Sequence, residues 1–125
     1  MLHRYNRNQR LLTARDFDRV FSKPAARVSS KYLLLLARPA DGDCSRLGLV
    51  MSKKNVGNAV RRNRIKRLCR EYFRLHAAEL PPTDLVLLAR PGISEVDNAG
   101  VRALLEELFS RLQARDAAHK RTDAH

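Results

Sequence analysis

Apolar and polar residues alternate along the first part of the chain with the spacing of a short helix. Phe17, Val20 and Phe21 stand at i, i+3 and i+4, which is typical of one helix face. Thr13 precedes them as a candidate N-cap residue, and Asp16 is its candidate capping-box partner. The pattern therefore predicts a helix that begins after Thr13 and ends before the first proline of the chain.

Three short apolar segments predict β-strands. Residues 31–38, KYLLLLAR, fit a helix or a strand by periodicity alone, but their length and the turn-rich PADGD that follows favour a strand and a hairpin. Residues 46–52, RLGLVMS, are the expected partner in that hairpin. Residues 84–90, DLVLLAR, lie between prolines and predict a buried strand.

Two longer segments predict α-helices. The first begins at Gly57 or Asn58 and continues to about Ala77, ahead of two adjacent prolines. The second begins near Ser94, and its apolar residues repeat at core spacing: Val101, Leu104, Leu105, Leu108, Phe109 and Leu112. This apolar stripe predicts a helix that packs against the core.

Length and composition bound the domain organisation. The chain has 125 residues, of which 44% are hydrophobic, which is enough for one folded domain over residues 10–113. Residues 1–9 are expected to form a flexible basic segment, and residues 114–125, where the periodicity is lost, a disordered tail. No apolar run reaches the roughly 18 residues of a membrane span, and the first residues lack a signal-peptide stretch. We therefore expect a cytoplasmic protein without a membrane partner.

The positive charge is concentrated in one part of the chain. The formal net charge is +12, and residues 53–74 alone hold nine Lys or Arg against a single Glu. Like charges at this density repel one another unless an anion lies against them. Neutralising a polyphosphate releases its condensed counterions, so this segment indicates a nucleic-acid partner.

A helical wheel separates the cations of this segment from its apolar residues. One face gathers Arg62, Asn63, Lys66, Arg67, Arg70 and Arg74 within about 140°. The opposite face comprises Ile65, Leu68, Cys69, Tyr72, Leu75 and His76. We expect the helix to pack through its apolar side and to present its arginines to phosphates, which their planar fork binds in a bidentate way.

Residues suited to protein-based catalysis or metal binding are few. The four histidines are scattered, and the Asp and Glu pairs do not form a two-metal pattern. Cys44 and Cys69 have the spacing of neither a disulfide scaffold nor a zinc site. We therefore predict no catalytic and no metal-binding residue in the polypeptide, which disfavours a nuclease that acts through its own side chains.

Two other classes of nucleic-acid-binding protein fit the charge. A ribosomal or other structural RNA-binding protein would need no more than this composition. A helix-turn-helix protein would need a short helix packed before its recognition helix, whereas strands precede the basic helix here. DNA is therefore not the expected partner.

The basic segment also carries a specific string, SKKNVGNAVRRNRIKRLCREYFR, over residues 52–74. It resembles the protein subunit of bacterial ribonuclease P, whose RNR signature stands here as Arg62-Asn63-Arg64. The string is far more specific than charge, and it disfavours the structural RNA-binding class. The resemblance extends to LLTARDFDRVF, RLGLVMSKK and PTDLVLLAR, and so spans roughly residues 10–112.

The resemblance implies a single α/β (α+β) domain of element order αβββαβα, similar to one domain of a small-subunit ribosomal protein. It also implies a left-handed βαβ crossover, although pattern reasoning alone favours the right-handed form. The implied activity belongs to a catalytic RNA subunit, which, with Mg²⁺, removes the 5′ leader of precursor tRNA by endonucleolytic cleavage. The protein would bind and assist that RNA and broaden its use of substrates.

The resemblance assigns two groups of site residues. Contacts to the ribonuclease P RNA are implied for Lys53, Lys54, Arg62, Asn63, Arg64, Lys66, Arg67 and Arg70. A cleft between the first helix and the sheet is implied to bind the precursor-tRNA leader through Phe17, Phe21, Tyr32 and Leu34, with aromatic rings stacked on single-stranded bases. Phe17 and Phe21 fit a core role equally well. Some family members carry further aromatic residues along the first strand, where this chain has only Tyr32, so weaker leader stacking is expected.

Overall fold

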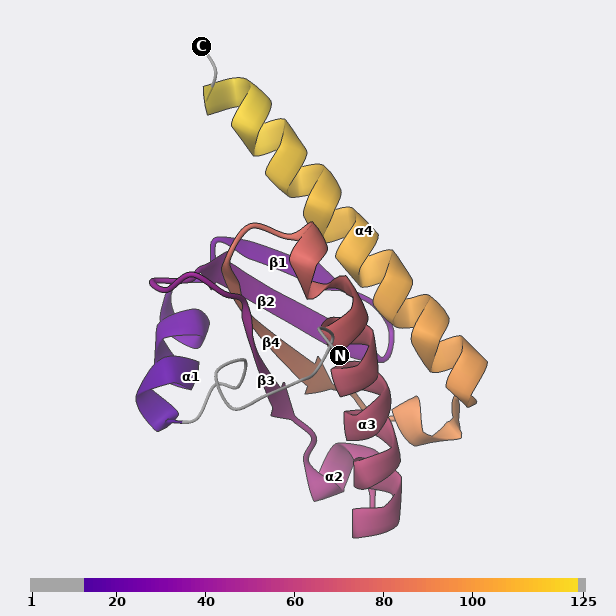
Figure 1. Ribbon diagram of the computed structural model, residues 1–125. Helices are drawn as coiled ribbons and strands as arrows, with labels where there is room; N and C mark the ends of the chain where they lie inside the picture. Colours follow the sequence, from indigo (N-terminus) through magenta and orange to yellow (C-terminus); the bar gives the residue numbers. More distant parts are fainter. Residues whose placement is uncertain (1–12, 124–125) are drawn as a thin grey trace.

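The computed structural model describes residues 13–123, with side chains up to Arg115, as a four-stranded sheet with helices on both faces (Figure 1). The α-helices are α1 (Ala14–Ser22), α2 (Lys53–Val56), α3 (Ala59–His76) and α4 (Asn98–Asp123). The strands are β1 (Ala26–Ser29), β2 (Leu33–Pro39), β3 (Arg46–Val50) and β4 (Thr83–Ala89). Two 3-10 turns, η2 (Ala77–Glu79) and η3 (Ile93–Glu95), follow α3 and β4. With α2 and α3 taken as one interrupted helix, the order αβββαβα is confirmed.

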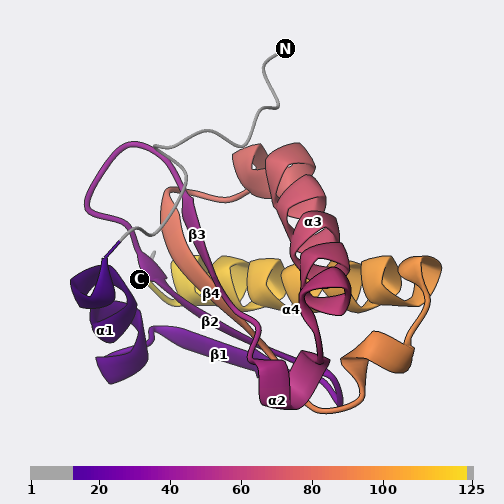
Figure 2. The same cartoon turned by 90° about the horizontal axis from the view of Figure 1, so that it is seen from below.

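The strand order of the sheet is β1-β2-β4-β3, so the expected hairpin between residues 31–38 and 46–52 is wrong. β2 pairs antiparallel with β1 and β4, and β3 pairs in parallel with β4. β4 takes a central place because it buries apolar side chains toward both faces: Leu85, Val86, Leu87 and Ala89. Parallel neighbours cannot be joined by a tight turn, so the chain crosses over through α2 and α3. This crossover is left-handed, as the resemblance implies (Figure 2).

Helices cover the two faces of the sheet unequally. α3 and α4 lie on one face and α1 lies on the other (Figure 2). The core under α3 and α4 is the larger, and its fully buried side chains include Leu33, Leu35, Ile65, Phe73, Leu85, Leu87, Leu105 and Leu108. The smaller core under α1 consists of Val20, Leu36 and Val86. Because successive side chains of a strand point to opposite faces, β2 and β4 contribute to both cores.

The start of α1 is fixed by its cap and by a chain of charged groups. Thr13 Oγ1 accepts a hydrogen bond from Asp16 N at 3.1 Å and Asp16 Oδ2 accepts one from Thr13 N at 3.4 Å, which confirms the predicted capping box. Asp16 Oδ1 also lies 3.6 Å from Arg46 Nη2. Arg46 in turn donates to the buried carboxylate of Asp84 through Nε at 2.9 Å and Nη2 at 2.8 Å. The hydrogen bonds to Asp84 raise the pKa of Arg46, and the network ties α1 to β3 and β4.

The edge strand β1 and the second half of α4 support each other. Patterning does not separate β1 as a strand, because it has four residues of which Val28 alone is buried. Arg111 Nη1 donates to the carbonyl of Ser29 at 2.8 Å, and Arg115 Nη1 donates to the carbonyl of Arg27 at 2.7 Å. Helical backbone continues to Asp123, past the expected end of the domain, since the Ala, Arg and Lys residues there favour helix. None of the helices within residues 13–123 is both long enough and apolar enough to cross a bilayer.

Candidate nucleic-acid interface

Local capping sets where the basic helix α3 begins. Asn58 is the N-cap, and its Oδ1 accepts the N–H of Arg61 at 3.0 Å. Gly57, immediately before it, has a φ of +112°, which favours glycine and turns the chain between α2 and α3. The predicted start at Gly57 or Asn58 and the predicted end near Ala77 are therefore confirmed, with the short helix α2 added in front.

A buried stripe docks α3 onto the larger core. It consists of Ile65, Leu68, Cys69 and Phe73. Burial raises the pKa of the Cys69 thiol to about 12, so this group stays neutral and acts in packing. Phe73, which the expected apolar face omits, is fully buried, whereas Leu75, which it includes, is 49% exposed. Around the helix axis, the buried side of α3 thus lies closer to Arg62 than the apolar face that the helical wheel predicts.

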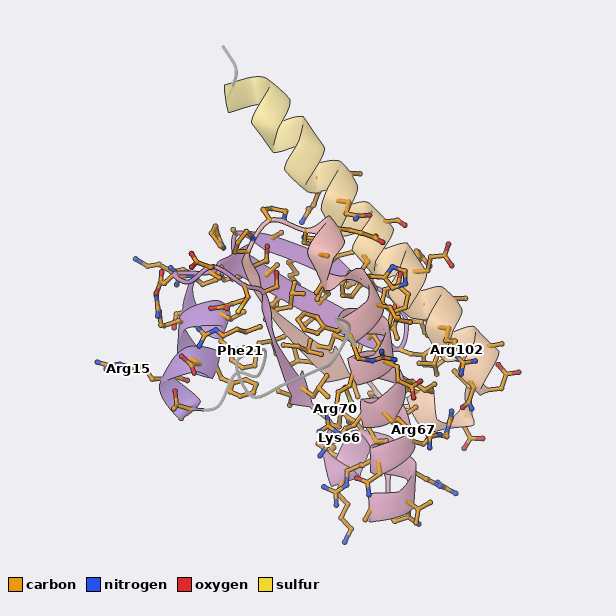
Figure 3. All side chains as sticks on the ribbon, in the orientation of Figure 1. Arg15, Phe21, Lys66, Arg67, Arg70 and Arg102 are labelled. Carbon is orange, nitrogen blue, oxygen red and sulfur yellow. The ribbon has the colours of Figure 1, made fainter. Side chains whose placement is uncertain are left out.

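The outward side of α3 carries the cationic face, which we define as Arg62, Asn63, Lys66, Arg67, Arg70 and Arg74. Asn63, Arg67 and Arg70 are exposed, and Lys66, Arg67 and Arg70 lie together along the middle of the helix (Figure 3). Five of the six residues of this face are cations, and within residues 13–115 none of the five forms an ion pair with a carboxylate. Lys53 and Lys54 are exposed on α2 and add charge beside the start of α3. The fold therefore presents a surface that is open to phosphate groups.

Arg62 lies at the border between the cationic face and the core. It is half-buried, and within the part of the chain that the structure describes its Nε is buried without a hydrogen-bond acceptor. A buried donor that lacks an acceptor costs about 1–3 kcal/mol. Since Nε has almost no exposed area, a phosphate at the surface can meet only the terminal nitrogens of this guanidinium.

Arg64, the third residue of the RNR signature, points to the other side of α3. Its Nη1 donates to Asn98 Oδ1 at 2.7 Å, and its Nη2 donates to the carbonyls of Val96 at 2.5 Å and Ser94 at 3.4 Å. Ser94 belongs to η3, Val96 follows it, and Asn98 is the first residue of α4. The structure therefore separates Arg64 from the other signature residues and places it between α3 and α4.

A groove of about 570 Å³ runs beside α1, opposite β3 and α3. Its lining consists of Ala14, Phe17, Asp18, Phe21, Leu49, Val50, Met51, Ser52 and Lys66, and we call it the α1–β3 groove. The rings of Phe17 and Phe21 are stacked, with centroids 6.5 Å apart, and Phe21 is 41% exposed. Figure 3 shows Phe21 on the side of α1 that faces β3 and α3, whereas Arg15 points away from them. The groove thus combines exposed aromatic surface with one amine, that of Lys66.

The other two residues expected in the cleft have different places. Leu34 packs against the smaller core beside Phe17 but is not part of the groove lining. Tyr32 packs against the larger core, and its ring is so close to Gly92 that a Cβ on that glycine would lie 2.9 Å from the ring. The structure therefore brings Phe17 and Phe21 together at the groove and leaves Tyr32 apart from them.

Several groove residues are absent from the sequence-based prediction. Val50 lies opposite Leu88, which in turn lies opposite Leu34, so that three half-buried aliphatic side chains form a row across β3, β4 and β2. The signal that could have found Val50 is the strand RLGLV itself, in which alternation places Val50 and Gly48 on one face. Which face that is depends on the position of α1, which strand periodicity does not reveal.

The described residues also bear on metal binding. Within them, no three His, Cys, Asp or Glu side chains come close enough together to hold a metal ion. The cations and aromatic rings described above are groups that bind nucleic acid by charge and stacking. The surface therefore offers binding chemistry and no cluster of protein carboxylates for a metal.

Comparison with known proteins decides the kind of nucleic-acid-binding protein. The sequence model of the family described as ribonuclease P matches residues 5–113. This chain belongs to the ribonuclease P protein family. The ribonuclease P protein component of Chromohalobacter salexigens is 48% identical over 109 residues, which cover 87% of this chain and 85% of that relative. The component of Pseudomonas aeruginosa is 47% identical over 108 residues, with coverage of 86% and 80%.

Solved ribonuclease P proteins share the fold. The protein of Staphylococcus aureus superposes with a TM-score of 0.78 at 30% identity, over 83% of this chain and 94% of that chain. The protein of Thermotoga maritima gives a TM-score of 0.68 at 38% identity, over 79% and 94%. Membership in the ribonuclease P family implies an RNA partner within a ribonucleoprotein. It excludes the alternative that this chain is a helix-turn-helix protein.

Proposed function

We propose that this chain is the protein subunit of a ribonuclease P whose catalytic RNA cleaves precursor tRNA. The RNA subunit binds to α2 and to the cationic face of α3, through Lys53, Lys54, Arg62, Asn63, Lys66, Arg67 and Arg70. The α1–β3 groove binds the single-stranded 5′ leader of the substrate. In this role the protein broadens substrate use and assists the Mg²⁺-dependent endonucleolytic step that produces the mature 5′ end of tRNA.

The observation that carries this proposal is the double position of Lys66. It belongs to the cationic face of α3, and it also lines the α1–β3 groove beside Phe17 and Phe21. A structured RNA on α3 and a single strand in the groove would therefore lie next to each other on one protein. A precursor tRNA bound to its catalytic RNA presents this combination of a folded partner and an unpaired leader.

The groove has the chemistry for a single strand of any sequence. An aromatic ring stacks on any base and contributes about 1–3 kcal/mol per base, because every base has a π-face. Phe21 offers such a ring at the surface, and the amine of Lys66 is suited to a backbone phosphate. The leader would then be bound by stacking and charge, which suits an enzyme that processes many different precursors.

The cationic face has a second role in this proposal. Two polyanions, the catalytic RNA and its substrate, repel each other, and cations placed between them lower that repulsion. Mg²⁺ would be held mainly by RNA phosphates and would supply charge stabilisation and an activated water for the hydrolysis. The side chains of this chain bind and orient the two RNAs, and none of them takes part in bond cleavage.

Processing of precursor tRNA at low Mg²⁺ tests the proposed function. The protein alone, a bacterial ribonuclease P RNA alone and the two together are compared for release of the 5′ leader. We expect cleavage only in the mixture. Cleavage by nuclease-treated protein alone would contradict the assignment of chemistry to RNA. No rescue by folded protein of an RNA that is active at high Mg²⁺ would reject the proposed function.

Phe21→Ala tests the groove with little risk to the fold, since the ring is 41% exposed. We expect affinity for precursor tRNA to fall about tenfold, because one stacking contact of about 1–2 kcal/mol is lost. Affinity for mature tRNA, which has no leader, should not change. Binding of both RNAs to the reconstituted holoenzyme is the measurement.

Leu75→Ala is the matched control for Phe21→Ala. Leu75 is a large apolar side chain of similar exposure, at 49%, and it lies on α3 outside the lining of the groove. It should leave both affinities unchanged. Equal losses for precursor and mature tRNA in Phe21→Ala would assign the ring to the fold and remove it from the leader site.

A further inference from the structure

The contacts of Arg64 bridge two helices that patterning treats as independent. Three hydrogen bonds from its guanidinium reach Asn98 Oδ1 and the carbonyls of Val96 and Ser94, which lie 30 to 34 residues further along the chain. These three acceptors form the turn from η3 into α4. A planar guanidinium can engage several acceptors at once, whereas a lysine amine has no such fork. Arg64 thus sets the position of the first turn of α4 relative to α3.

The residue one turn after this anchor is Arg102. In an α-helix, residues i and i+4 lie on the same face, so Arg102 follows Asn98 on the side of α4 that is held against α3. The same side carries Phe109, whose ring meets the ring of Tyr72 on α3 with centroids 5.0 Å apart. Arg102 therefore lies along the flank of α4 that borders α3, between two contacts that join the helices.

Arg102 is available to an anion at this place. Its side chain is exposed, and Figure 3 shows it on α4 on the same side of the molecule as Arg67. Glu106 follows one turn later, but within residues 13–115 no ion pair joins Arg102 to a carboxylate. The positive surface thus continues from the cationic face of α3 onto the start of α4.

We propose that Arg102 is a phosphate ligand on the RNA-binding surface, and that Arg64 is the positioning residue that places it there without contacting RNA itself. The RNR signature then has two jobs: Arg62 and Asn63 serve the RNA surface directly, and Arg64 extends that surface to a second helix. This inference rests on the proposed function, because it assumes the RNA subunit as the partner. It differs from the motif-based expectation, in which Arg64 itself binds the catalytic RNA.

The salt dependence of RNA binding distinguishes the two roles. Each phosphate contact contributes about 0.9 to the slope of log affinity against log salt concentration for a duplex-like partner. Binding of the full-length protein to ribonuclease P RNA is measured over a salt series for wild type, Arg102→Gln, Arg64→Gln, Arg64→Lys and the double variant Arg64→Gln/Arg102→Gln. Melting temperatures of the same proteins show that each is folded at the assay temperature.

We expect Arg102→Gln to reduce the slope by about 0.9 with an unchanged melting temperature. Arg64→Gln and Arg64→Lys should each reduce the slope by the same amount and lower the melting temperature, because both displace the start of α4. The double variant should show no further loss of slope. Arg111→Gln is the control, since it removes an exposed arginine of the same helix that faces β1, and it should leave the slope unchanged.

Three results would overturn the inference. An unchanged slope in Arg102→Gln would remove Arg102 from the interface. Additive losses of slope in the double variant, about 1.8 in total, would identify Arg64 as a separate phosphate ligand. A slope in Arg64→Lys equal to that of the wild type would lead to the same conclusion. If the wild-type protein fails to bind ribonuclease P RNA, the proposed function fails first, and that result is distinct from a change of slope among binding variants.

Discussion

Replacing Lys66, Arg67 and Arg70 together by alanine should weaken binding to ribonuclease P RNA about 100-fold at roughly 0.1 M salt. These side chains lie together on α3 and form no ion pair with a carboxylate within residues 13–115 (Figure 3). Each phosphate contact contributes about 1 kcal/mol net, so the loss of three amounts to about 3 kcal/mol. The salt slope should fall by about 2.7, since three sets of counterions are no longer released. Filter binding or fluorescence anisotropy over a salt series measures both quantities.

The matched control removes the same number of positive charges elsewhere. Arg15, Lys23 and Arg27 are exposed residues on or near α1 and β1, and Arg15 points away from α3 (Figure 3). Their replacement by alanine should change affinity only slightly, through the lower net charge, and leave the slope almost unchanged. If this control lost as much slope as the α3 variant, the protein would bind RNA through its net charge, and the cationic face would not be a defined interface.

Asp84→Ala should lower the free energy of unfolding by about 3 kcal/mol, the largest stability effect that we expect from one polar residue. The Asp84 carboxylate is 4% exposed and accepts both hydrogen bonds of the Arg46 fork. Removing one partner of a buried ion pair leaves the other charge uncompensated, which costs several kcal/mol. Arg46 also reaches Asp16 at the start of α1, so the loss should loosen that helix. Chemical denaturation measures the change.

Two further variants show whether the pair itself is responsible. Asp41→Ala breaks a second arginine–aspartate pair, with Arg19, in which both side chains are exposed, and it should leave the melting temperature unchanged. The double variant Arg46→Met/Asp84→Leu removes both charges and should regain most of the lost stability. A double variant as unstable as Asp84→Ala would show that packing at this position, and not an unpaired Arg46, accounts for the loss.

Elements defined by local signals could be predicted from the sequence. The capping box at Thr13 and Asp16 lies where residue order alone places it, because a cap involves residues only three positions apart. The N-cap of α3, Asn58, is one of the two residues predicted to start the basic helix. The stripe of Ile65, Leu68 and Cys69 is buried as its helical period predicts. The prediction of residues 84–90 as a buried strand is confirmed for the same kind of reason, since a short continuous apolar run between prolines is recognised from adjacent residues alone.

Elements defined by long-range pairing could not be predicted in this way. The hairpin expected between β2 and β3 is replaced by pairing of both strands with β4, a strand that enters the sheet after α3. Strand periodicity describes one strand at a time, and it holds no information on which neighbour is chosen. The resemblance implies that Tyr32 lies near Phe17 and Phe21, but it lies just before β2, where its ring meets Gly92.

The family, the basic helix and the separation of its cationic and apolar sides can all be recognised from the sequence, because each depends on residues that are close in the chain. Three further features emerge only when the chain is folded: the order of the strands, the α1–β3 groove in which Lys66 joins Phe17 and Phe21, and the contact of Arg64 with Asn98. Each of these unites residues separated by 30 or more positions, whose meeting depends on how the whole sheet and its helices pack. For this reason the RNR signature looks uniform in the sequence but divides in the folded protein: Arg62 and Asn63 belong to the cationic face, which we propose binds RNA, and Arg64 anchors the start of α4.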